Sequence, residues 1–477
     1  MRHSLFDLLA ERAATNPDAV AYTHDDARVT YRQLFDDAGA IASGLTQGGV
    51  RPRDRVAVIM PAGLDWVRAF WGIQRAGAVS CAFNPYVPAE TARRRAERVR
   101  SRLIITSLEE VPRGSVDFPR VDVALDELAF LQPTSGTSGE SRAVMIRQRN
   151  ILGVLDTSHA AYGVGPDDVL VSWVPPWHDL GLVRFVIGAV YNGAPCHIVA
   201  PSIQTIPRWL ETVTRERATI TGAPDFAYRM AARMVDPARI DLSSVRWMTN
   251  GGEPVRASTI EMFESRFGRR GIVCPGYGLA EATLGVTFTR PEEPILVDDH
   301  GNVGCGKALP GVEVRIDGGE ILVRGPGVFA GYFDAPEATA QTLRDGWLHT
   351  GDIGHLDSAG NLYVLGRRRA MIKRGGAVLA PRELEEAAQQ IEGVRVAAAV
   401  SLARTNDGTE EIVLAIEIDP RLEQNAIVAA VAQEVQRTIG FAPERVLALP
   451  PRSIPRTYNG KIRHDALREQ LMSSRSG

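Results

Sequence analysis

The stretch RVAVIMPAGLDWVRAFWGIQRAGAVSCAFNP, residues 55–85, decides the fold class. Its two ends, RVAVIMP and AVSCAFNP, are short apolar runs closed by proline, which is typical of buried strands. The segment between them, LDWVRAFWGIQRAGA, has the apolar spacing of an amphipathic helix and is closed by glycine. A strand, a helix and a second strand in this order predict a parallel sheet covered by helices.

The same alternation continues on both sides of this stretch. SLFDLLAERAATNP at 4–17 has the pattern of an amphipathic helix, and further buried strands are expected in CHIVAPS at 196–202, ATITGAPDF at 218–226 and GIVCPGYG at 271–278. We therefore predict an α/β fold in which residues 1–366 form a large domain of mostly parallel sheets covered by helices.

The pattern changes from about residue 303. GVEVRIDGGEILVRGPGVFAGYF, at 311–333, has shorter strands separated by glycines, so a small β-rich subdomain is expected at about 303–366. Two apolar strands, at 394–403 and 411–418, and an amphipathic helix at 425–440 follow. They predict a small α+β domain over residues 367–477, with the boundary at Gly366 to Arg369.

Composition excludes several classes of protein. The chain has 477 residues, 44% hydrophobic and 23% charged, with a net charge of −3, which indicates a multidomain globular protein without affinity for nucleic acid. No apolar run approaches the roughly 18 residues of a membrane span, and the first residues lack the pattern of a secretory signal. The four scattered cysteines predict neither a disulfide framework nor a zinc site, so a cytoplasmic location is expected.

Lysine is rare in this chain. Of 54 basic residues only Lys307, Lys373 and Lys461 are lysines. Because a compact ammonium and a planar guanidinium are not interchangeable, each lysine is a candidate for a specific role. The basic stretch from Thr91 to Arg102 fits either a solvated helix face or a docking surface for an acidic partner.

The first chemical motif is LQPTSGTSGESRAVM, residues 131–145. Alternating hydroxyl residues and glycines allow backbone N–H groups to approach phosphate oxygens closely. A loop of this composition is also an ordinary turn, and it lacks the GK[ST] ending of a P-loop.

Further motifs follow in order. WVPPWHDLGL (173–182), NGGEPVR (250–256) and YGLAEATLG (277–285) each come after an expected strand, where ligands of open α/β sheets gather. Asp352 and Arg367 lie in WLHTGDIGHLDSAGNLYVLGRRRAMIKRGG (347–376), and Lys461 lies in IPRTYNGKIRHDAL (454–467).

With these motifs the sequence resembles the adenylate-forming superfamily of acyl-CoA synthetases, peptide-synthetase adenylation domains and luciferases. The wording PPWHDLGL, NGGEPVR, YGLAEATL and GCGKALPG (304–311) is most similar to the fatty acyl-AMP ligases. The resemblance covers essentially the whole chain and implies the cofactors ATP and Mg²⁺, with CoA as one acyl acceptor.

The resemblance also implies roles for individual residues. Those expected to bind ATP are Thr134, Ser135, Gly136, Thr137, Ser138, Gly139, Gly252, Glu253, Pro254, Tyr277, Gly278, Leu279, Ala280, Asp352 and Arg367. Those expected to take part in catalysis are Lys461, Glu281 (as the Mg²⁺ ligand), His178 and Arg142. His178, Asn250 and Gly251 would contact the substrate, and Arg369 matches the hinge of a rotating C-terminal domain, a lid. Lys373 either contacts substrate in one state of the lid or is solvated.

These roles agree with the chemistry. A carboxylate is a poor electrophile, and attack of its oxygen on the α-phosphate of ATP creates the good leaving group AMP. The transition state gathers negative charge, so positioned cations and Mg²⁺ are expected to dominate catalysis.

Two departures from the family pattern concern the loop and the acceptor. Arg142 and Ala143 replace the usual lysine and glycine, and Pro133 replaces an aromatic residue. Only residues 285–304 lie between Leu284 and Cys305, where fatty acyl-AMP ligases carry an insertion associated with the exclusion of CoA.

Four functions stay open at this stage. The first is an acyl- or aryl-AMP ligase that transfers the acyl group to a carrier-protein thiol in a specialised biosynthesis. The second is an acyl-CoA synthetase, and the third activates nitrite for transfer to an aromatic amine. The fourth is a non-catalytic scaffold, suggested by Arg142. The motif WHDLG does not match the ammonium-binding aspartate of amino-acid-activating domains.

Overall fold

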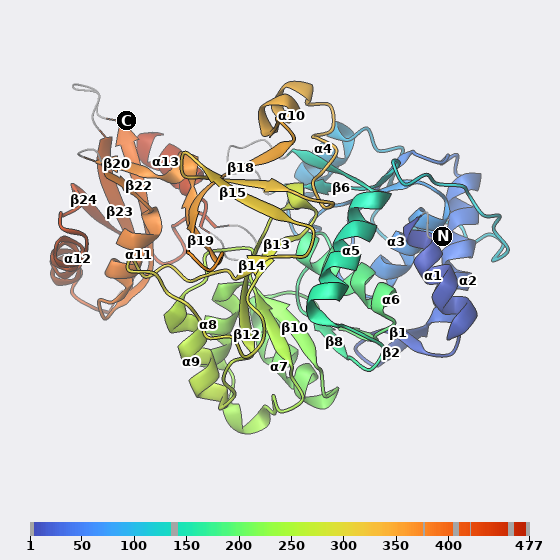
Figure 1. Cartoon of the computed structure of the whole chain (residues 1–477), viewed down its shortest axis with the longest axis horizontal. Helices are drawn as coiled ribbons and strands as arrows, with labels where there is room; N and C mark the ends of the chain where they lie inside the picture. Colours follow the sequence, from blue (N-terminus) through green and yellow to red (C-terminus); the bar gives the residue numbers. More distant parts are fainter. Residues whose placement is uncertain are drawn as a thin grey trace. The chain divides into compact units, whose positions relative to one another are not determined.

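The computed structural model describes residues 4–134, 142–374, 377–403, 410–419, 421–456 and 462–473. Its contacts divide the chain into two compact units. The larger one comprises residues up to Thr134, Arg142–Thr350 and His355–Val364, and the smaller one comprises Gly351–Gly354 and the chain from Leu365 onward. Each unit is described by itself (Figure 1).

A mixed sheet of nine strands forms the centre of the larger unit among the described residues. In spatial order its strands are β14 (Lys307–Ala308), β13 (Gly285–Phe288), β12 (Val273–Gly278), β11 (Trp247–Asn250), β10 (Ile220–Ala223), β8 (Leu170–Ser172), β9 (Cys196–Ile198), β1 (Val20–His24) and β2 (Ala27–Thr30). The strands from β12 to β1 in this order are parallel, and β2 and β13 pair antiparallel at the two sides.

A second sheet contains the stretch that predicted the fold. Its strands, in spatial order, are β5 (Leu103–Ile105), β3 (Arg55–Val58), β4 (Val79–Ala82), β6 (Leu128–Pro133) and β7 (Ala143–Arg147). β3 and β4 are parallel, with Arg55 opposite Val79, and helix α3 (Leu64–Arg75) connects them. The strand–helix–strand unit predicted from residues 55–85 is confirmed.

The large sheet is buried on both faces because its side chains alternate between two hydrophobic clusters. Val171, Met248 and Val273 belong to one cluster, with aromatic residues of the helices on that face. Leu170 and Trp247, one position earlier on their strands, belong to the other cluster. The period of two along a strand sends neighbours to opposite faces, so each face needs its own helical cover.

Helices provide this cover. Those of the larger unit are α1 (Leu5–Thr15), α2 (Tyr31–Gln47), α3, α4 (Ala89–Arg98), α5 (Gln148–Tyr162), α6 (Gly188–Asn192), α7 (Ile206–Arg215), α8 (Asp225–Met234), α9 (Ala257–Phe267) and α10 (Pro336–Thr342), with the π-helix η2 (Leu180–Ile187) and the 3₁₀ turns η1 (Leu108–Glu110), η3 (Ile203–Thr205), η4 (Pro237–Arg239) and η5 (Ala280–Ala282). Ser4 begins α1 with a reciprocal cap to Asp7, as the sequence pattern indicates. None of these helices, nor any other in the described part of the chain, is long and apolar enough to cross a membrane.

A smaller antiparallel sheet follows, formed by β15 (Glu313–Asp317), β16 (Glu320–Arg324), β18 (Trp347–Leu356) and β17 (Leu343–Arg344), with β19 (Leu362–Arg367) also paired to β18. It occupies the region predicted to be rich in β structure.

The C-terminal part of the smaller unit is an α+β arrangement. Its elements are η6 (Arg368–Ala370), β20 (Ile372–Arg374), β21 (Ala377–Leu379), α11 (Pro381–Gln389), β22 (Val394–Ala403), β23 (Glu410–Ile418), α12 (Gln424–Ile439), β24 (Arg445–Leu449) and α13 (His464–Ser473). β22 pairs antiparallel with β23, and β24 pairs parallel with it on the other side. The sequence predicts a small α+β domain here, and the structure has the same class of fold.

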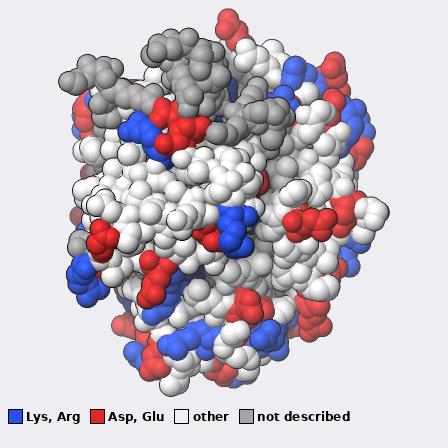
Figure 2. Space-filling model, turned by 90° about the vertical axis from the view of Figure 1, so that its left-hand side faces the viewer, with Lys and Arg blue, Asp and Glu red and all other residues white. Residues whose placement is uncertain are grey.

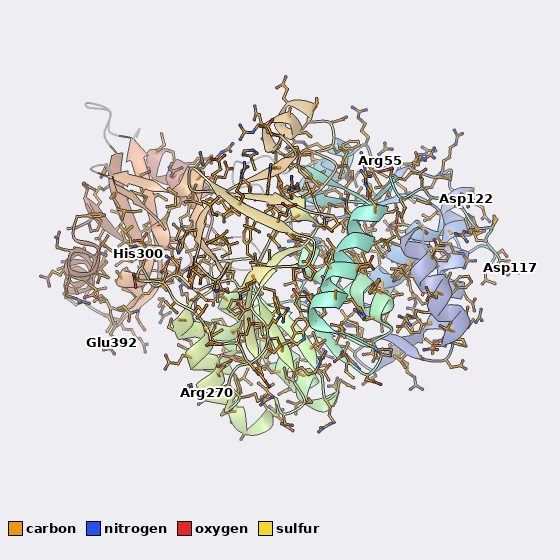
Figure 3. All side chains as sticks on the ribbon, viewed as in Figure 1. Arg55, Asp117, Asp122, Arg270, His300 and Glu392 are labelled. Atoms are coloured by element: carbon orange, nitrogen blue, oxygen red, sulfur yellow. The ribbon has the colours of Figure 1, made fainter. Side chains whose placement is uncertain are left out.

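Charged side chains lie mainly at the surface. Asp117, Arg270 and Glu392 are exposed and are labelled at the periphery of Figure 3. On the face drawn in Figure 2, the described basic and acidic residues are interspersed. Helix α4, within the basic stretch, buries only Ala92 and Ala96 and presents its other residues outward, as a solvated helix face does.

Candidate active site

The predicted motifs gather where the parallel strands of the large sheet end. β8, β10, β11 and β12 are neighbours and run in the same direction. The segments that follow three of them are WVPPWHD, GGEPVR and LAEATL, at 173–179, 251–256 and 279–284. The carboxyl ends of parallel strands meet at one edge of the sheet, which is where ligands bind in folds of this kind.

The predicted phosphate loop connects the two strands of a hairpin. β6 and β7 pair antiparallel up to Pro133, which lies opposite Ala143. Thr134 N–H donates to the Arg142 carbonyl at 2.8 Å, and Arg142 N–H donates to Thr134 Oγ1 at 3.2 Å. These bonds close the base of the loop. Ser135, Gly136, Thr137, Ser138 and Gly139 lie outside the described residues, so their roles stay predictions.

Glu281 lies on the short turn η5 between β12 and β13. The turn is closed by a bond from Leu279 N–H to the Leu284 carbonyl at 2.9 Å. A Cβ at Gly278 would lie 1.9 Å from that carbonyl oxygen, so only glycine fits there. Thr283 has φ +67°, which costs backbone energy in a non-glycine residue, and its hydroxyl donates to the Gly327 carbonyl at 2.6 Å.

The segment 327–333 ties this turn to the phosphate-loop hairpin. Phe329 N–H donates to the Glu281 carbonyl at 2.9 Å, and Phe333 N–H donates to the Ala143 carbonyl of β7 at 2.8 Å. Tyr332 lies between them and forms an antiparallel bridge with Val144. Two motifs that are more than 130 residues apart in the sequence thus share one connecting segment.

Tyr332 contacts two predicted catalytic residues at once. Its hydroxyl donates to Glu281 Oε1 at 2.7 Å, and the Arg142 guanidinium lies 5.2 Å from its ring centre, in the range of a cation–π contact. Burial and the neighbouring Glu281 carboxylate raise the pKa of Tyr332, so the hydroxyl stays protonated and remains a donor. Tyr332 was not predicted from the sequence, although an aromatic residue after Gly331 in GVFAGYF was a visible signal.

His178 lies in the loop after β8. Its Nδ1 is 2.6 Å from Asp179 Oδ1, which also accepts from Leu180 N–H at 2.7 Å, and its side chain is 40% exposed. A Cβ at Gly252 would lie 3.9 Å from the His178 ring, so His178 is close to the NGGEPVR loop. The ring is both oriented by its neighbours and accessible, which a gate at a substrate site requires.

The NGGEPVR loop is anchored to helix α8. Glu253 Oε1 accepts from Phe226 N–H in the first turn of α8 at 2.6 Å. Asn250 is fully buried, and its amide donates to Asp225 Oδ1 at 3.2 Å. Its Oδ1 has no partner among the described residues. Asn250 therefore braces the loop, and its contact with the substrate stays a prediction.

The other residues predicted at the motif edge lie close in sequence to Asn250 and Glu253 or at the end of β12. Gly251 and Gly252 follow Asn250 directly, and Gly252 has φ +86°, a conformation that glycine adopts without strain. Pro254 follows Glu253 in the same loop. Tyr277 is half-buried at the end of β12 and packs against the main hydrophobic cluster.

Leu279 and Ala280 continue from the end of β12 into the turn that carries Glu281. Leu279 is buried and Ala280 is partly exposed. Their contact with ATP stays a prediction.

In the smaller unit, Asp352 and Arg367 lie on the paired strands β18 and β19. Arg367 Nε is 2.8 Å from Asp352 Oδ1, and Asp352 is 5% exposed. The ion pair orients the carboxylate that is predicted to accept the ribose hydroxyls. Arg369 lies in η6 and Lys373 in β20, and the roles suggested for them stay predictions.

Lys461 lies outside the described residues, but the segments on both sides of it are well anchored. Arg456 and Ile462 form an antiparallel bridge, and Arg456 pairs with Glu417. His464 Nε2 is 2.6 Å from Glu385 Oε1, which also accepts from Ala399 N–H at 3.0 Å. The described residues on both sides of the lysine thus have defined partners.

Of the carboxylates at the motif edge of the larger unit, that of Glu281 is the one predicted to bind Mg²⁺. Among the described residues, no group of three or more His, Cys, Asp or Glu side chains could hold a metal by itself. This fits Mg²⁺, which usually binds one or two protein carboxylates and takes its remaining ligands from water and phosphates.

Comparison with known proteins agrees with this geometry. Residues 9–333, more than half of the chain, match the family described as AMP-binding enzyme. The chain belongs to this family, and it is an ATP-dependent adenylate-forming ligase.

The protein is similar over its whole length to ligases of fatty acids. It is 28% identical to the medium-chain-fatty-acid–[acyl-carrier-protein] ligase JamA of Moorena producens, over 98% of this chain and 95% of JamA. It is 29% identical to a long-chain-fatty-acid–AMP ligase of Mycobacterium marinum, over 98% and 97% of the two chains. The match with JamA extends over 564 positions, more than the 477 residues of this chain, so JamA has additional residues.

Solved structures have the same fold. A structure from work on fatty acyl-adenylate ligases of E. coli and L. pneumophila aligns with a TM-score of 0.89 and 25% identity, over 100% of this chain and 98% of that one. An anthranilate CoA ligase in complex with anthranoyl-AMP aligns with a TM-score of 0.86 and 20% identity, over 99% and 98%. The α/β fold class predicted from the sequence is confirmed.

Proposed function

We propose that this protein activates a carboxylate as an acyl-AMP and then transfers the acyl group to the thiol of a carrier protein. The observation that carries the proposal is the chain of contacts from Arg142 through Tyr332 to Glu281. It places one cation and one carboxylate beside the phosphate-loop hairpin, where a nucleotide needs a counter-charge and a metal ligand.

The reaction is a double displacement. A carboxylate oxygen of the substrate attacks the α-phosphorus of ATP, the bond to pyrophosphate breaks, and pyrophosphate leaves. A thiolate then attacks the acyl carbonyl carbon, and the bond to AMP breaks. When bound to Glu281, Mg²⁺ supplies charge neutralisation on the phosphates.

The residues of this chain would bind and orient the substrates and stabilise the charge of the transition state. Lys461 would contact the substrate oxyanion and the α-phosphate, and Arg142 would bind phosphate oxygens in place of the usual lysine. His178 would border the carboxylate site. The other predicted residues, Thr134 to Gly139, Gly251 to Pro254, Tyr277 to Ala280, Asp352 and Arg367, would hold the nucleotide.

The acyl acceptor has two candidates. JamA is named as a ligase that uses an acyl carrier protein, which supports a carrier-protein thiol. A relative of 27% identity from Rhodococcus jostii is named as a CoA ligase, which supports CoA. The direct β13–β14 connection through residues 289–306, without an insertion, also leaves CoA open.

The first experiment is a measurement of AMP and pyrophosphate release from Mg-ATP. The panel contains fatty, aryl and short carboxylates and nitrite, each with CoA, with a carrier protein or with neither. Lys461→Ala is measured in parallel, and Lys307→Ala is the control because Lys307 is exposed on β14. Loss of one positioned cation typically lowers the rate about 10²–10³-fold.

The outcomes separate the candidates. Release driven by a carboxylate, lost in Lys461→Ala and kept in Lys307→Ala, supports adenylation, and the dependence on CoA or carrier protein identifies the acceptor. Release driven by nitrite alone would indicate that the protein activates nitrite for a diazotising reaction and does not activate a carboxylate. No release from any substrate, together with no thermal stabilisation by ATP, would indicate a scaffold.

A further inference from the structure

A buried side chain, that of Gln132, joins the loop that carries His178 to the phosphate-loop hairpin. Gln132 is the penultimate residue of β6 and is 4% exposed. Its amide nitrogen, Nε2, donates to the carbonyl of Trp177 at 2.8 Å. β6 belongs to the second sheet, and Trp177 lies in the loop after β8 of the large sheet. This bond therefore connects the two sheets at the motif edge.

The carbonyl that Gln132 contacts belongs to the peptide unit that enters His178. The N–H of the same unit donates to the Pro175 carbonyl at 3.0 Å, and the His178 carbonyl accepts from Leu182 N–H at 2.9 Å. The backbone of His178 is thus held on both sides of its Cα. Gln132 contributes a contact from another sheet, which relates the position of His178 to the phosphate-loop hairpin.

The same row of the hairpin also leads to Glu281. Gln132 lies opposite Val144 of β7, and Val144 forms the antiparallel bridge with Tyr332. The Tyr332 hydroxyl in turn donates to the Glu281 carboxylate. Side chains at paired positions of neighbouring strands lie on the same face of a sheet. One row of residues, two positions before Thr134 at the base of the phosphate loop, therefore contacts both the loop after β8 and the turn of Glu281.

The polar group of Gln132 is not explained by packing. Its Oε1 is buried and has no hydrogen-bond partner among the described residues. A buried polar atom without a partner costs free energy, whereas an apolar side chain of similar size would avoid this cost. The balance favours a role for the amide N–H, which is the group that contacts the peptide unit of His178.

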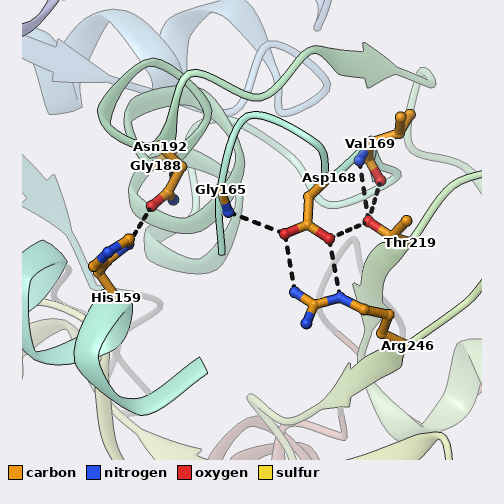
Figure 4. A network of polar contacts seen from close by, with 8 residues as sticks. All are labelled: His159, Gly165, Asp168, Val169, Gly188, Asn192, Thr219 and Arg246. Carbon is orange, nitrogen blue, oxygen red and sulfur yellow. Dashed lines mark hydrogen bonds and ion pairs between the residues drawn. The ribbon is translucent and has the colours of Figure 1, made fainter. Parts of the chain in front are cut away.

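A separate network fixes the beginnings of the strands (Figure 4). Arg246, before β11, contacts both carboxylate oxygens of Asp168, before β8, at 3.0 and 2.9 Å. Asp168 also accepts from Thr219, before β10, at 2.7 Å and from Gly165 N–H at 3.0 Å. These contacts tie three strands together at the end away from the motifs. Loss of the Gln132 bond should therefore displace the loop after β8 and leave the strands in place.

We propose that Gln132 is a positioning residue that sets the distance between the substrate carboxylate and the α-phosphate of ATP. The inference rests on the proposed function, in which His178 borders the carboxylate site and the phosphate-loop hairpin holds the nucleotide. Because Gln132 is part of that hairpin, its amide keeps the carboxylate site in register with the phosphates. A displacement of about 1 Å between reacting groups can lower a rate roughly 10²-fold.

The test replaces Gln132 by methionine, which has a similar volume and no N–H donor. ATP–pyrophosphate exchange is measured on the full-length chain with the carboxylate that supports the highest rate. Gln132→Met is expected to lower kcat/KM for the carboxylate about 10–100-fold and to change the KM for ATP by less than about twofold, because β6 and β7 stay paired.

Gln74→Met is the matched control. Gln74 of α3 is also 4% exposed, and its Nε2 donates to a backbone carbonyl of β6, that of Ala129, at 3.0 Å. The control removes the same kind of bond from the same strand, away from the loop of His178. It is expected to lower the stability of the protein and to leave kcat/KM for the carboxylate unchanged.

A double-mutant cycle tests whether Gln132 acts through His178. If it does, Gln132→Met should have little further effect in a His178→Ala background, because the side chain that it positions is absent. An equal loss in both backgrounds would overturn the proposal. A rise in the KM for ATP as large as the rise in the KM for the carboxylate would also overturn it.

Amide hydrogen exchange of residues 173–182 gives a readout that does not need activity. The N–H groups of His178 and Leu182, both bonded within this segment, should exchange faster in Gln132→Met than in the wild type and at the wild-type rate in Gln74→Met. Unchanged exchange in Gln132→Met would contradict the proposal. If no acid supports pyrophosphate exchange but amide exchange depends on Gln132, the proposed function fails and the role of Gln132 in holding the loop stands.

Discussion

Two predicted catalytic residues, Glu281 and Lys461, lie in segments whose contacts differ. Glu281 is fixed by residues far from it in sequence, since Tyr332 contacts its carboxylate and Phe329 its carbonyl. The segments on the two sides of Lys461 meet in a bridge between Arg456 and Ile462. Glu281 is therefore tied into the packing of the larger unit by its own carboxylate, whereas the described contacts near Lys461 are made by the residues that flank it.

Removal of the Glu281 carboxylate is expected to have the largest effect on the adenylation rate. Glu281→Gln should lower the adenylation rate about 10²–10³-fold, because a neutral amide is a weak Mg²⁺ ligand. The measurement is pyrophosphate release as a function of Mg²⁺ concentration. Glu337→Gln, at an exposed glutamate of α10, is the control. Equal activity of the two variants would contradict the role of Glu281.

Removal of the Tyr332 hydroxyl, which contacts the Glu281 carboxylate, should lower the adenylation rate less. Tyr332→Phe deletes one hydrogen bond to a charged group, worth about 1.5–3 kcal/mol, so a fall of roughly 10–100-fold in kcat is expected. As a positioning residue, Tyr332 should also set the Mg²⁺ concentration at half-maximal rate, which should rise in the variant. An unchanged Mg²⁺ dependence would reduce Tyr332 to a packing residue.

The corresponding change in the smaller unit tests the contact between Glu385 and His464. Glu385→Gln weakens the contact with His464, three residues after Lys461. We expect a fall of several-fold, up to about tenfold, in kcat, since the bridge between Arg456 and Ile462 is kept. The KM for ATP should stay the same. A larger loss than in Tyr332→Phe would reverse the comparison between the two regions.

Changes in the body of the large sheet, away from the edge that carries the motifs, should alter only the stability of the protein. Burial lowers the pKa of His197 on β9, although Glu216 acts in the opposite direction. The contribution to stability is therefore fully present above the unfolded pKa, near 6.5, and is lost as the pH falls toward the folded value. Urea unfolding at pH 7.5 and 5.5 should show this loss in the wild type and less of it in His197→Gln, with kcat at pH 7.5 unchanged.

The sequence was sufficient for the elements and for the chemistry of the motifs. The apolar runs at 55–61 and 78–85 predicted β3 and β4, because burial on both faces requires uninterrupted apolar strands. Motif residues such as Glu253 and Glu281 were visible because acidic residues beside glycines at strand ends have few structural reasons to be there. Arg142 was recognised as a departure, but its ring partner was not.

Contacts between segments that are far apart in the sequence could not be predicted in the same way. The contact of Tyr332 with Glu281 and that of Glu253 with the first turn of α8 depend on which segments become neighbours in three dimensions. A single sequence contains periodicity and local chemistry, which determine the elements and the reactive groups. Packing alone decided the orientation of those groups, because each lies against residues that no local pattern connects to it.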